Sequence, residues 1–242
     1  MQKERAVRRR ALAAALPHTL PVLTGYGFLG MAYGMLMQVA GFNAWYSLGI
    51  SALVFGGSLQ YVMASVLAAP FAPVATFCMA LMLQARHLFY GIAMLDRYKA
   101  LGAKRFYLIF GLTDETFSIN CAVTPPADVD EGWFMFFVTL LNHSYWVAAS
   151  VVGTLLGSWL QFNTEGLDFV MTAMFAVIFL EQWLKEKQHY SSLIGLCATA
   201  ACRLVFGPES FLVPAMACIL LGLAAFRKPI LAKDPLEEVT AP

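Results

Sequence analysis

The sequence contains few charged residues for its length. Lysine, arginine, aspartate and glutamate make up 13% of the 242 residues, whereas hydrophobic residues make up 60%. A soluble domain carries about 25% charged residues. This composition excludes an ordinary water-soluble fold and predicts an integral membrane protein.

Several functional motifs are also missing. The five cysteines all fall in apolar runs without a C-x-x-C pair, so we interpret them as packing residues rather than metal ligands or redox centres. No G-x-x-x-x-G-K-[ST] segment occurs, so ATP hydrolysis would need another polypeptide. The net charge is +1 without a long charged tract beyond the N-terminal flank, which argues against nucleic acid as a partner. We expect no metal and no cofactor.

Apolar runs of about the length that crosses a bilayer, roughly 20 residues, occupy most of the chain. They lie near residues 18–39, 45–69, 71–95, 106–123, 132–160, 167–184, 191–206 and 211–226. The predicted fold class is therefore all-α, a polytopic integral membrane helix bundle with seven or eight spans and with broken or re-entrant helices.

We expect one transmembrane domain over residues 17–226. A basic cytoplasmic flank at 1–16 precedes it, and a polar tail at 227–242 follows it. The connections between the apolar runs are too short to fold a soluble catalytic domain. Any activity must therefore lie within the membrane or at its surfaces.

The distribution of basic residues leaves the topology open. With eight spans both termini are cytoplasmic and the basic loop at 97–105 is outside; if one segment between 45 and 95 is re-entrant, that loop returns inside while later basic groups move out. Pro70 and Pro73 leave only a tight connection between the second and third runs, which favours a hairpin or broken helix there.

One segment of the first run spells G-x-G-x-x-G, the dinucleotide-binding fingerprint, but it lies in a membrane run with no preceding strand. We instead predict that Gly27, Gly30 and Gly34 form a small face that a neighbouring helix approaches closely. Gly153 and Gly157 repeat this spacing.

Polar residues within apolar runs are the candidates for function because their burial in lipid costs free energy. In the second run these are Gly56, Gly57, Ser58 and Gln60. A discontinuous helix there would point free N–H groups inward, which suits a carboxylate. The alternative is an ordinary kink with Gln60 bonded to a neighbouring helix.

The third run contains R-H-L-F-Y-G from Arg86. Arginine can hold a carboxylate through two hydrogen bonds, and the neighbouring His87 can change charge near neutral pH. The alternative is that Arg86 reaches the membrane interface and His87 bonds a carbonyl group. Because Arg97 and Lys99 already mark that interface, we favour a buried role for Arg86.

The fourth run places two adjacent carboxylates, Asp114 and Glu115, in the middle of a short span. Two ionised carboxylates in hydrocarbon are very costly, so we expect that one of them is protonated or that both face cations or water. They are candidates for carrying protons or holding a substrate ammonium; the alternative is a fixed pair with Arg86. Adjacent helical residues point about 100° apart, so at most one should face a given ligand.

Other polar residues are weaker candidates. Asp168 fits the N-terminus of a helix, and Arg203 lies near the end of a run, where capping or reaching the interface is the ordinary role. Asn142, His143 and Ser144 lie near the middle of the fifth run. We favour packing over a role in lining a path for these three.

These elements, taken in order, resemble the AzlC/YgaZ family. A glycine-rich first helix is followed by G-G-S-L-Q-Y from Gly56, R-H-L-F-Y-G from Arg86, L-T-D-E-T-F from Leu112 and G-L-D-F from Gly166. The resemblance covers roughly residues 17–225. Its R-H-x-x-Y-G and T-D-E elements, in that order, are the most specific part.

The resemblance implies the large subunit of a bacterial branched-chain amino acid exporter in the inner membrane, without enzymatic activity. A small membrane partner of the AzlD/YgaH type is implied as well. The expected substrates are valine, leucine, isoleucine and methionine, exported with the energy of a proton gradient. A passive channel or the membrane subunit of an ATP-driven transporter is the alternative.

An amino acid substrate suggests roles for the charged candidates, which we assign as a hypothesis. Arg86 and the Gly56–Gly57 break would hold the substrate carboxylate, Asp114 or Glu115 would hold the ammonium or a coupling proton, and His87 would transfer protons. An amino acid needs such a pair of charges and an apolar pocket. The complete set of substrate-binding or proton-coupling candidates is Gly56, Gly57, Ser58, Gln60, Arg86, His87, Tyr90, Asp114, Glu115 and Asp168.

Overall fold

The computed structural model describes residues 2–70, 72–159, 176, 179–180, 183–184 and 189–226. Within these ranges all regular structure is helical, which confirms the predicted all-α class. Three helical segments there are long and apolar enough to cross a membrane: Glu4–Val39, Glu131–Trp159 and Tyr190–Gly207. The chain divides into two compact units, Met1–Asp168 and Phe169–Pro242.

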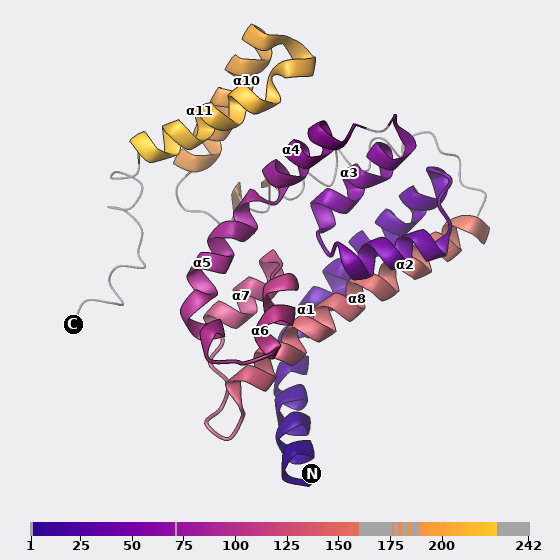
Figure 1. Cartoon of the computed structure of the whole chain (residues 1–242), viewed down its shortest axis with the longest axis vertical. Coiled ribbons are helices and arrows are strands. Elements are labelled where there is room, and N and C mark those ends of the chain that lie inside the picture. Colours follow the sequence, from indigo (N-terminus) through magenta and orange to yellow (C-terminus); the bar gives the residue numbers. More distant parts are fainter. Residues whose placement is uncertain are drawn as a thin grey trace. The chain divides into compact units, whose positions relative to one another are not determined.

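The first unit contains most of the described helices (Figure 1). They are α1 (Gln2–Val39), α2 (Ala44–Leu53), α3 (Gly57–Ala68), α4 (Pro73–Leu83), α5 (Ala85–Lys99), α6 (Lys104–Phe110), α7 (Asp114–Ala122) and α8 (Glu131–Trp159). Three of the predicted runs are thus broken into two helices each, α2 with α3, α4 with α5, and α6 with α7. The basic N-terminal flank is continuous with the first helix.

Helices α1 and α8 form the central pair of this unit and run in the same direction (Figure 1). Near their starts, the Arg8 guanidinium lies 4.3 Å from the centre of the Trp133 ring. About halfway along, the ring centres of Tyr26 and Trp146 are 5.2 Å apart. Helices α2, α6 and α7 contact α8, and α2 and α3 contact α1.

Small residues allow α1 and α8 to approach closely. A Cβ atom added to Gly34 would collide with the Ser150 carbonyl oxygen, and one added to Gly153 would collide with the Met31 backbone. Two further glycines, Gly30 and Gly157, also face the partner helix at Cβ contact distances of 2.7 Å and 3.3 Å. The predicted packing face is confirmed at these four positions.

Gly27 is the exception in the predicted glycine face. A Cβ atom there would meet nothing within 4 Å. The part of the prediction that included Gly27 is therefore wrong, because the close approach of α8 begins further along α1.

Helix α2 runs against α8. The Ser47 hydroxyl, near the start of α2, lies 2.7 Å from the Thr154 hydroxyl in the second half of α8. Near the end of α2, the Ser51 carbonyl oxygen lies 3.3 Å from Nε2 of His143, which comes earlier in α8. Helix α2 therefore runs antiparallel to α8 and ends near the middle of α8.

Helix α3 then turns back and follows the direction of α1. Phe55, in the break between α2 and α3, lies with its ring centre 6.5 Å from that of Tyr26. Further along α3, the Tyr61 hydroxyl donates a hydrogen bond of 2.6 Å to the Leu29 carbonyl oxygen, one turn further along α1. Because α1 and α8 run in the same direction, α2 and α3 form a hairpin with its tip at residues 54–56.

Helix α6 approaches the middle of α8 from the other end, because it runs from the start of α8 toward its middle. Lys104, at the start of α6, has its ammonium 4.3 Å from the centre of the Trp133 ring. At the end of α6, the Phe110 ring centre lies 5.7 Å from that of His143. Helix α6 therefore runs in the same direction as α8.

Helix α7 returns to the starting end of α8. Thr116, in its first turns, accepts a hydrogen bond of 3.1 Å from the Asn142 amide. Near its C-terminus, the Asn120 carbonyl oxygen accepts a hydrogen bond of 2.5 Å from Arg97, which also pairs with Glu131 at the start of α8. Helices α6 and α7 thus form a second hairpin, with its tip at residues 111–113.

Helices α4 and α5 form one interrupted helix rather than a hairpin. Only Gln84 separates them, and α5 continues from the end of α4 with a change of direction (Figure 1). Helix α5 lies beside α7 and runs in the same direction, because Arg86 pairs with Asp114 at their starts and Tyr98 accepts a hydrogen bond of 3.2 Å from Asn120 toward their ends.

The second unit contains α10 (Tyr190–Ser210) and α11 (Leu212–Ala225), which pack against each other. The Cys202 and Cys218 sulfur atoms lie 3.8 Å apart between these helices, and both thiols are free. For these two cysteines this agrees with the predicted packing role. Helix α10 contains a kink at Gly207, where φ is +75°.

Candidate functional site

Three helices begin in the interior of the first unit, each after a short break. Helices α3, α5 and α7 start after residues 54–56, Gln84 and residues 111–113. The first turn of any helix leaves backbone N–H groups without intrahelical partners and carries partial positive charge. The prediction of a broken helix at Gly56–Gly57 is confirmed, and two further breaks accompany it.

Arg86 joins the first turns of these three helices. Its Nη1 lies 2.9 Å from Oδ2 of Asp114 in α7, and its Nη2 donates a hydrogen bond of 3.1 Å to the Ser58 hydroxyl in α3. The side chains of Arg86 and Asp114 are 34% and 35% exposed. Arg86 is therefore held inside the unit by an ion pair, which was one of the alternatives left open by the sequence.

The Arg86–Asp114 pair retains unused hydrogen-bonding capacity. Nε of Arg86 and Oδ1 of Asp114 are both buried without a hydrogen-bond partner among the described residues, as is Nδ1 of the neighbouring His87. Buried polar atoms in native proteins are nearly always hydrogen-bonded, so an unsatisfied one requires an explanation. Here a free donor and a free acceptor lie on the two members of one ion pair.

Glu115 faces a different part of the unit. It accepts a hydrogen bond of 2.5 Å from the Tyr26 hydroxyl of α1, and that hydroxyl also lies 3.0 Å from the Thr113 hydroxyl. Asp114 faces Arg86 instead. The two carboxylates thus point toward different partners, as their adjacent helical positions predict.

Helix α7 is positioned by several polar contacts in addition to these. Thr113 caps its N-terminus by accepting a hydrogen bond of 3.4 Å from the Thr116 amide. The buried Thr116 and Asn120 side chains bond to neighbouring helices, and Arg97 donates to carbonyl groups at its C-terminus. Helix α7 is therefore held at both ends, and this fixes the position of Asp114.

Gln60 does not join the Arg86 cluster. It is fully buried, its Oε1 accepts a hydrogen bond of 2.6 Å from the Trp146 indole, and its Nε2 donates one of 3.1 Å to the Ser51 hydroxyl. This is the alternative in which Gln60 bonds to neighbouring helices. It holds the α2–α3 hairpin against α8.

The two glycines of the break differ in their surroundings. A Cβ atom at Gly56 would collide with the Gln84 side-chain amide, whereas one at Gly57 would lie 3.4 Å from the Trp146 ring. Because Gly56 has no side chain, Gln84, which precedes α5, can lie close to Gly56, which precedes α3. This close approach brings the starts of the two helices together.

Phe55 has a backbone conformation that the sequence does not reveal. Its φ is +40°, an uncommon value for a residue with a bulky side chain. The ring is buried, and its centre lies 4.4 Å from that of His143 and 6.4 Å from that of Phe110. Such outliers are often found at functional sites, and here the ring fills the space between the two hairpin tips.

His143 and its neighbours bond within the helix bundle. The His143 ring lies 2.9 Å from the Tyr107 hydroxyl and 3.3 Å from the Ser51 carbonyl oxygen. Asn142 donates to α7, and Ser144 bonds the Leu140 carbonyl oxygen of its own helix. These contacts favour the packing interpretation for all three residues.

His87 and Tyr90 extend the cluster along α5. Their ring centres are 5.7 Å apart, and the Tyr90 ring stacks on Phe117 of α7 at 4.5 Å. Aromatic surface thus lies one turn beyond the Arg86–Asp114 pair. The remaining candidate, Asp168, lies outside the described residues.

Comparison with known proteins points to one family. The model of the AzlC protein family matches residues 21–160. The chain is 53% identical to the branched-chain amino acid transport protein AzlC of Bacillus subtilis, over 91% of this chain and 87% of that protein.

More distant relatives are also named as membrane proteins. An uncharacterized membrane protein of Haemophilus influenzae is 44% identical over 88% of both chains. The inner membrane protein YgaZ of Escherichia coli is 27% identical over 76% of this chain and 75% of that protein. No solved structure matches the chain.

Proposed function

The chain belongs to the AzlC family, and from this premise we propose that it is the large subunit of an exporter of branched-chain amino acids. The substrates are valine, leucine, isoleucine and methionine, and the driving force is the proton gradient. Transport as such agrees with the name of the Bacillus subtilis relative. Direction, substrates and energy source are the new parts of the proposal.

The observation that supports an amino acid substrate is the free donor and free acceptor on the Arg86–Asp114 pair. An amino acid is a zwitterion, so its carboxylate can accept from Nε of Arg86 while its ammonium donates to Oδ1 of Asp114. Both contacts form without breaking the existing ion pair. A substrate with only one charge would satisfy only one of the two atoms.

The surroundings of the pair suit the remainder of such a substrate. The starts of α3 and α5 present N–H groups and partial positive charge to the carboxylate. The rings of Tyr90 and Phe117 offer apolar surface to an aliphatic side chain. Gly56, Gly57 and Ser58 supply the α3 side of the site.

We assign the coupling proton to Glu115 or His87 rather than to Asp114. Asp114 is engaged by Arg86, whereas Glu115 has Tyr26 as its partner and no cation within ion-pair distance in the described part of the chain. His87 adjoins Arg86 and has a free ring nitrogen. Either group can therefore change its protonation without first losing a salt bridge.

A small membrane protein of the AzlD/YgaH type completes the proposed exporter. Exposed apolar surface on the first unit is extensive, including Leu88, Phe89 and Ile92 on α5. A second membrane subunit would find apolar surface there. The export assay should therefore be performed with and without such a subunit.

The test is efflux of preloaded radiolabelled valine, leucine and methionine from cells that lack their own exporters. We expect efflux that requires this chain and stops when a protonophore is added. Arg86→Gln should abolish it, whereas Arg105→Gln, at an exposed site on α6, should not. Efflux indifferent to the protonophore would indicate a channel or an ATP-driven system, and absence of efflux with both subunits in the membrane would refute the substrate assignment.

A further inference from the structure

The charged residues of the first unit are distributed very unevenly. Residues 11–85 and 132–159 contain no lysine, arginine, aspartate or glutamate. Apart from the interior group Arg86, Asp114 and Glu115, the charges of residues 2–159 therefore fall in two segments, 2–10 and 96–131.

Contacts place these two charged segments at one end of the unit. Arg8 and Lys104 lie on the same Trp133 ring, each 4.3 Å from its centre. Arg10 lies 3.9 Å from Asp128, and Lys104 lies 3.6 Å from Asp130. The start of α1, the start of α6, the loop after α7 and the start of α8 thus share one end, which we call the basic end.

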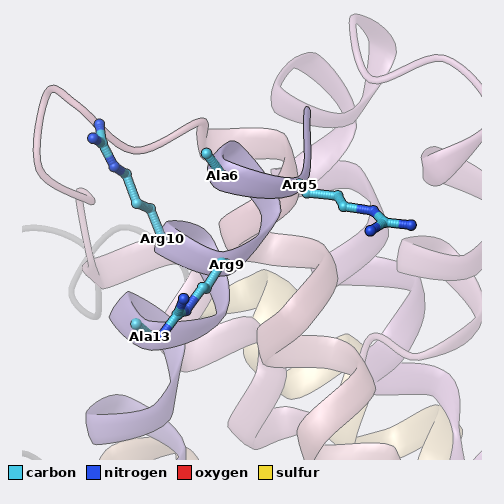
Figure 2. Close-up of a pocket in the computed structure, with 5 residues that line it drawn as sticks. All are labelled: Arg5, Ala6, Arg9, Arg10 and Ala13. Atoms are coloured by element: carbon cyan, nitrogen blue, oxygen red, sulfur yellow. The ribbon is translucent and has the colours of Figure 1, made fainter. Parts of the chain in front are cut away.

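The arginines at this end do not converge on a single ligand. Figure 2 shows a pocket lined by Arg5, Ala6, Arg9, Arg10 and Ala13, in which the three guanidinium groups point in different directions. The three arginines surround the start of α1. A cluster of basic residues at this position is typical of the cytoplasmic flank of a membrane helix.

At the opposite end, the two connections that the structure describes are uncharged. The α1–α2 connection at 40–43 and the α3–α4 connection at 69–72 contain no charged residue. The α2–α3 hairpin starts from this neutral end and returns to it, whereas the α6–α7 hairpin starts from the basic end and returns to it. Neither hairpin passes from one end of α8 to the other.

We propose that residues 44–68 and 104–122 are re-entrant hairpins that enter the membrane from opposite sides and meet at the Arg86–Asp114 pair. The basic end is cytoplasmic, because the excess of lysine and arginine lies there. Only α1, α4 with α5, and α8 then cross the membrane within residues 2–159. This arrangement differs from both topologies considered from the sequence.

The burial of the hairpin tips supports this arrangement. Broken backbone is tolerated at membrane depth only where protein or water covers it. Phe55 and Gly56 at one tip, and residues 111–113 at the other, are all buried. Each tip is covered by the other tip and by α1 and α8 rather than by lipid.

The arrangement gives the two hairpins different tasks, a consequence that rests on the proposed transport function. Ser58 belongs to the hairpin that enters from the outer side, and Asp114 belongs to the hairpin that enters from the cytoplasmic side. Arg86, in the membrane-crossing segment formed by α4 and α5, contacts both residues. Movement of α6–α7 would open the pair toward the cytoplasm. Movement of α2–α3 would open it toward the outside.

Cysteine labelling tests the topology independently of transport. In a version with all five cysteines replaced by serine, single cysteines are placed at exposed loop alanines: Ala72→Cys, Ala103→Cys and Ala127→Cys. Ala6→Cys and Asn43→Cys serve as references at the two ends. Intact cells are treated with a membrane-impermeant maleimide, and permeabilised cells show that each cysteine can react.

Each topology predicts a different labelling pattern from outside. Two opposed hairpins predict labelling of Ala72→Cys alone among the three test positions. Eight spans predict labelling of Ala103→Cys alone. A single re-entrant segment at 45–69 predicts labelling of Ala72→Cys and Ala127→Cys, and one at 71–95 predicts labelling of Ala127→Cys alone. Any of these three patterns would overturn the proposal, whatever the outcome of the efflux assay.

A reversible cross-link tests the movement of the outer hairpin. The Ser47 and Thr154 hydroxyl oxygens are 2.7 Å apart, so Ser47→Cys with Thr154→Cys should form a disulfide that pins α2 to α8. We expect the oxidised double variant to lose at least tenfold in leucine efflux and a reductant to restore it, with each single variant as control. Full efflux by protein shown to be cross-linked would exclude movement of α2 as the gate.

Discussion

Two hairpin tips meet beside Arg86, and they bring different groups to it. Helix α3 begins with Gly57 and Ser58, which are uncharged, whereas α7 begins with Asp114 and Glu115. Both helices present their N-terminal ends, so the partial positive charge of the backbone is common to the two tips. The tips therefore differ in the charge of their side chains.

The two tips are also held in different ways. The α7 tip is anchored through its functional residues, because Asp114 pairs with Arg86 and Glu115 bonds Tyr26. The α3 tip is anchored mainly through Gln60, which bonds Trp146 and Ser51 at a distance from the pair. A ligand at the Arg86–Asp114 pair should therefore affect the position of α7 directly and that of α3 chiefly through Ser58.

The largest expected effect comes from removing the charge at the α7 tip. Asp114→Asn keeps the shape of the side chain but leaves the Arg86 cation without its ion-pair partner. Loss of one member of a partly buried pair typically costs about 2 kcal/mol or more, which corresponds to about a thirtyfold weaker binding of leucine. Leucine binding to purified protein in detergent measures this change directly.

The matched control for that variant is Asp128→Asn, at an exposed loop position. Oδ2 of Asp128 lies 3.9 Å from Nη1 of Arg10. This variant removes an equal charge outside the site and should leave leucine binding within twofold of the original, because exposed ion pairs contribute about 0 to 1 kcal/mol. Equal loss in both variants would indicate a general effect of net charge and would contradict the assignment of Asp114.

A second pair of variants changes the neutral tip. Gly56→Ala should moderately reduce leucine efflux, because the terminal amide of Gln84 must move aside for the new methyl group, whereas Gly57→Ala should have a smaller effect because its methyl group meets the Trp146 ring at 3.4 Å. Combining Gly56→Ala with Gln84→Ala removes the colliding group. Recovery of efflux in the double variant would identify this contact, and failure to recover would mean that Gly56 is needed for another reason.

Tyr26→Phe separates the two carboxylates of the α7 tip. It removes the hydroxyl that donates to Glu115 and leaves the Arg86–Asp114 pair intact. A lost hydrogen bond to a charged group costs about 1.5 to 3 kcal/mol. We expect leucine binding to be nearly unchanged while the dependence of efflux on external pH shifts; loss of binding without a change in pH dependence would assign Glu115 to the substrate instead.

The smallest effect is expected from Ser58→Ala, which removes the hydroxyl that accepts from Arg86. The donor is a charged guanidinium that is 34% exposed, so this bond contributes less than the about 1.5 to 3 kcal/mol of a buried charge-assisted bond, and leucine binding should weaken by about threefold to tenfold. Ser144→Ala, which loses only a bond within α8, is the control. A loss for Ser58→Ala as large as that for Asp114→Asn would mean that the two tips contribute equally.

Much of this site follows from local sequence. Glycines next to polar residues in an apolar run predict the broken helix at Gly56–Gly57, and the cost of an isolated charge in lipid predicts that Arg86 and the carboxylates have partners. Helical geometry predicts that Asp114 and Glu115 face different neighbours. The family resemblance from the sequence is confirmed by the match over residues 21–160.

Other features depend on contacts between distant segments. The break at Gln84 has neither glycine nor proline, and it exists where the Gln84 amide approaches Gly56. The direction of each hairpin is set by pairs such as Ser47 with Thr154, which no local pattern reveals. The positive φ of Phe55 likewise occurs where its ring packs against Phe110 and His143, which are distant in the sequence.

The central claim is that the Arg86–Asp114 pair binds a zwitterion, and competition for leucine tests it most directly. Purified protein with radiolabelled leucine is challenged with 4-methylpentanoate, which lacks the ammonium, and with 3-methylbutylamine, which lacks the carboxylate. We predict that unlabelled leucine displaces the label and that each analogue requires at least about a thirtyfold higher concentration. Displacement by either analogue at the same concentration as leucine would contradict the account.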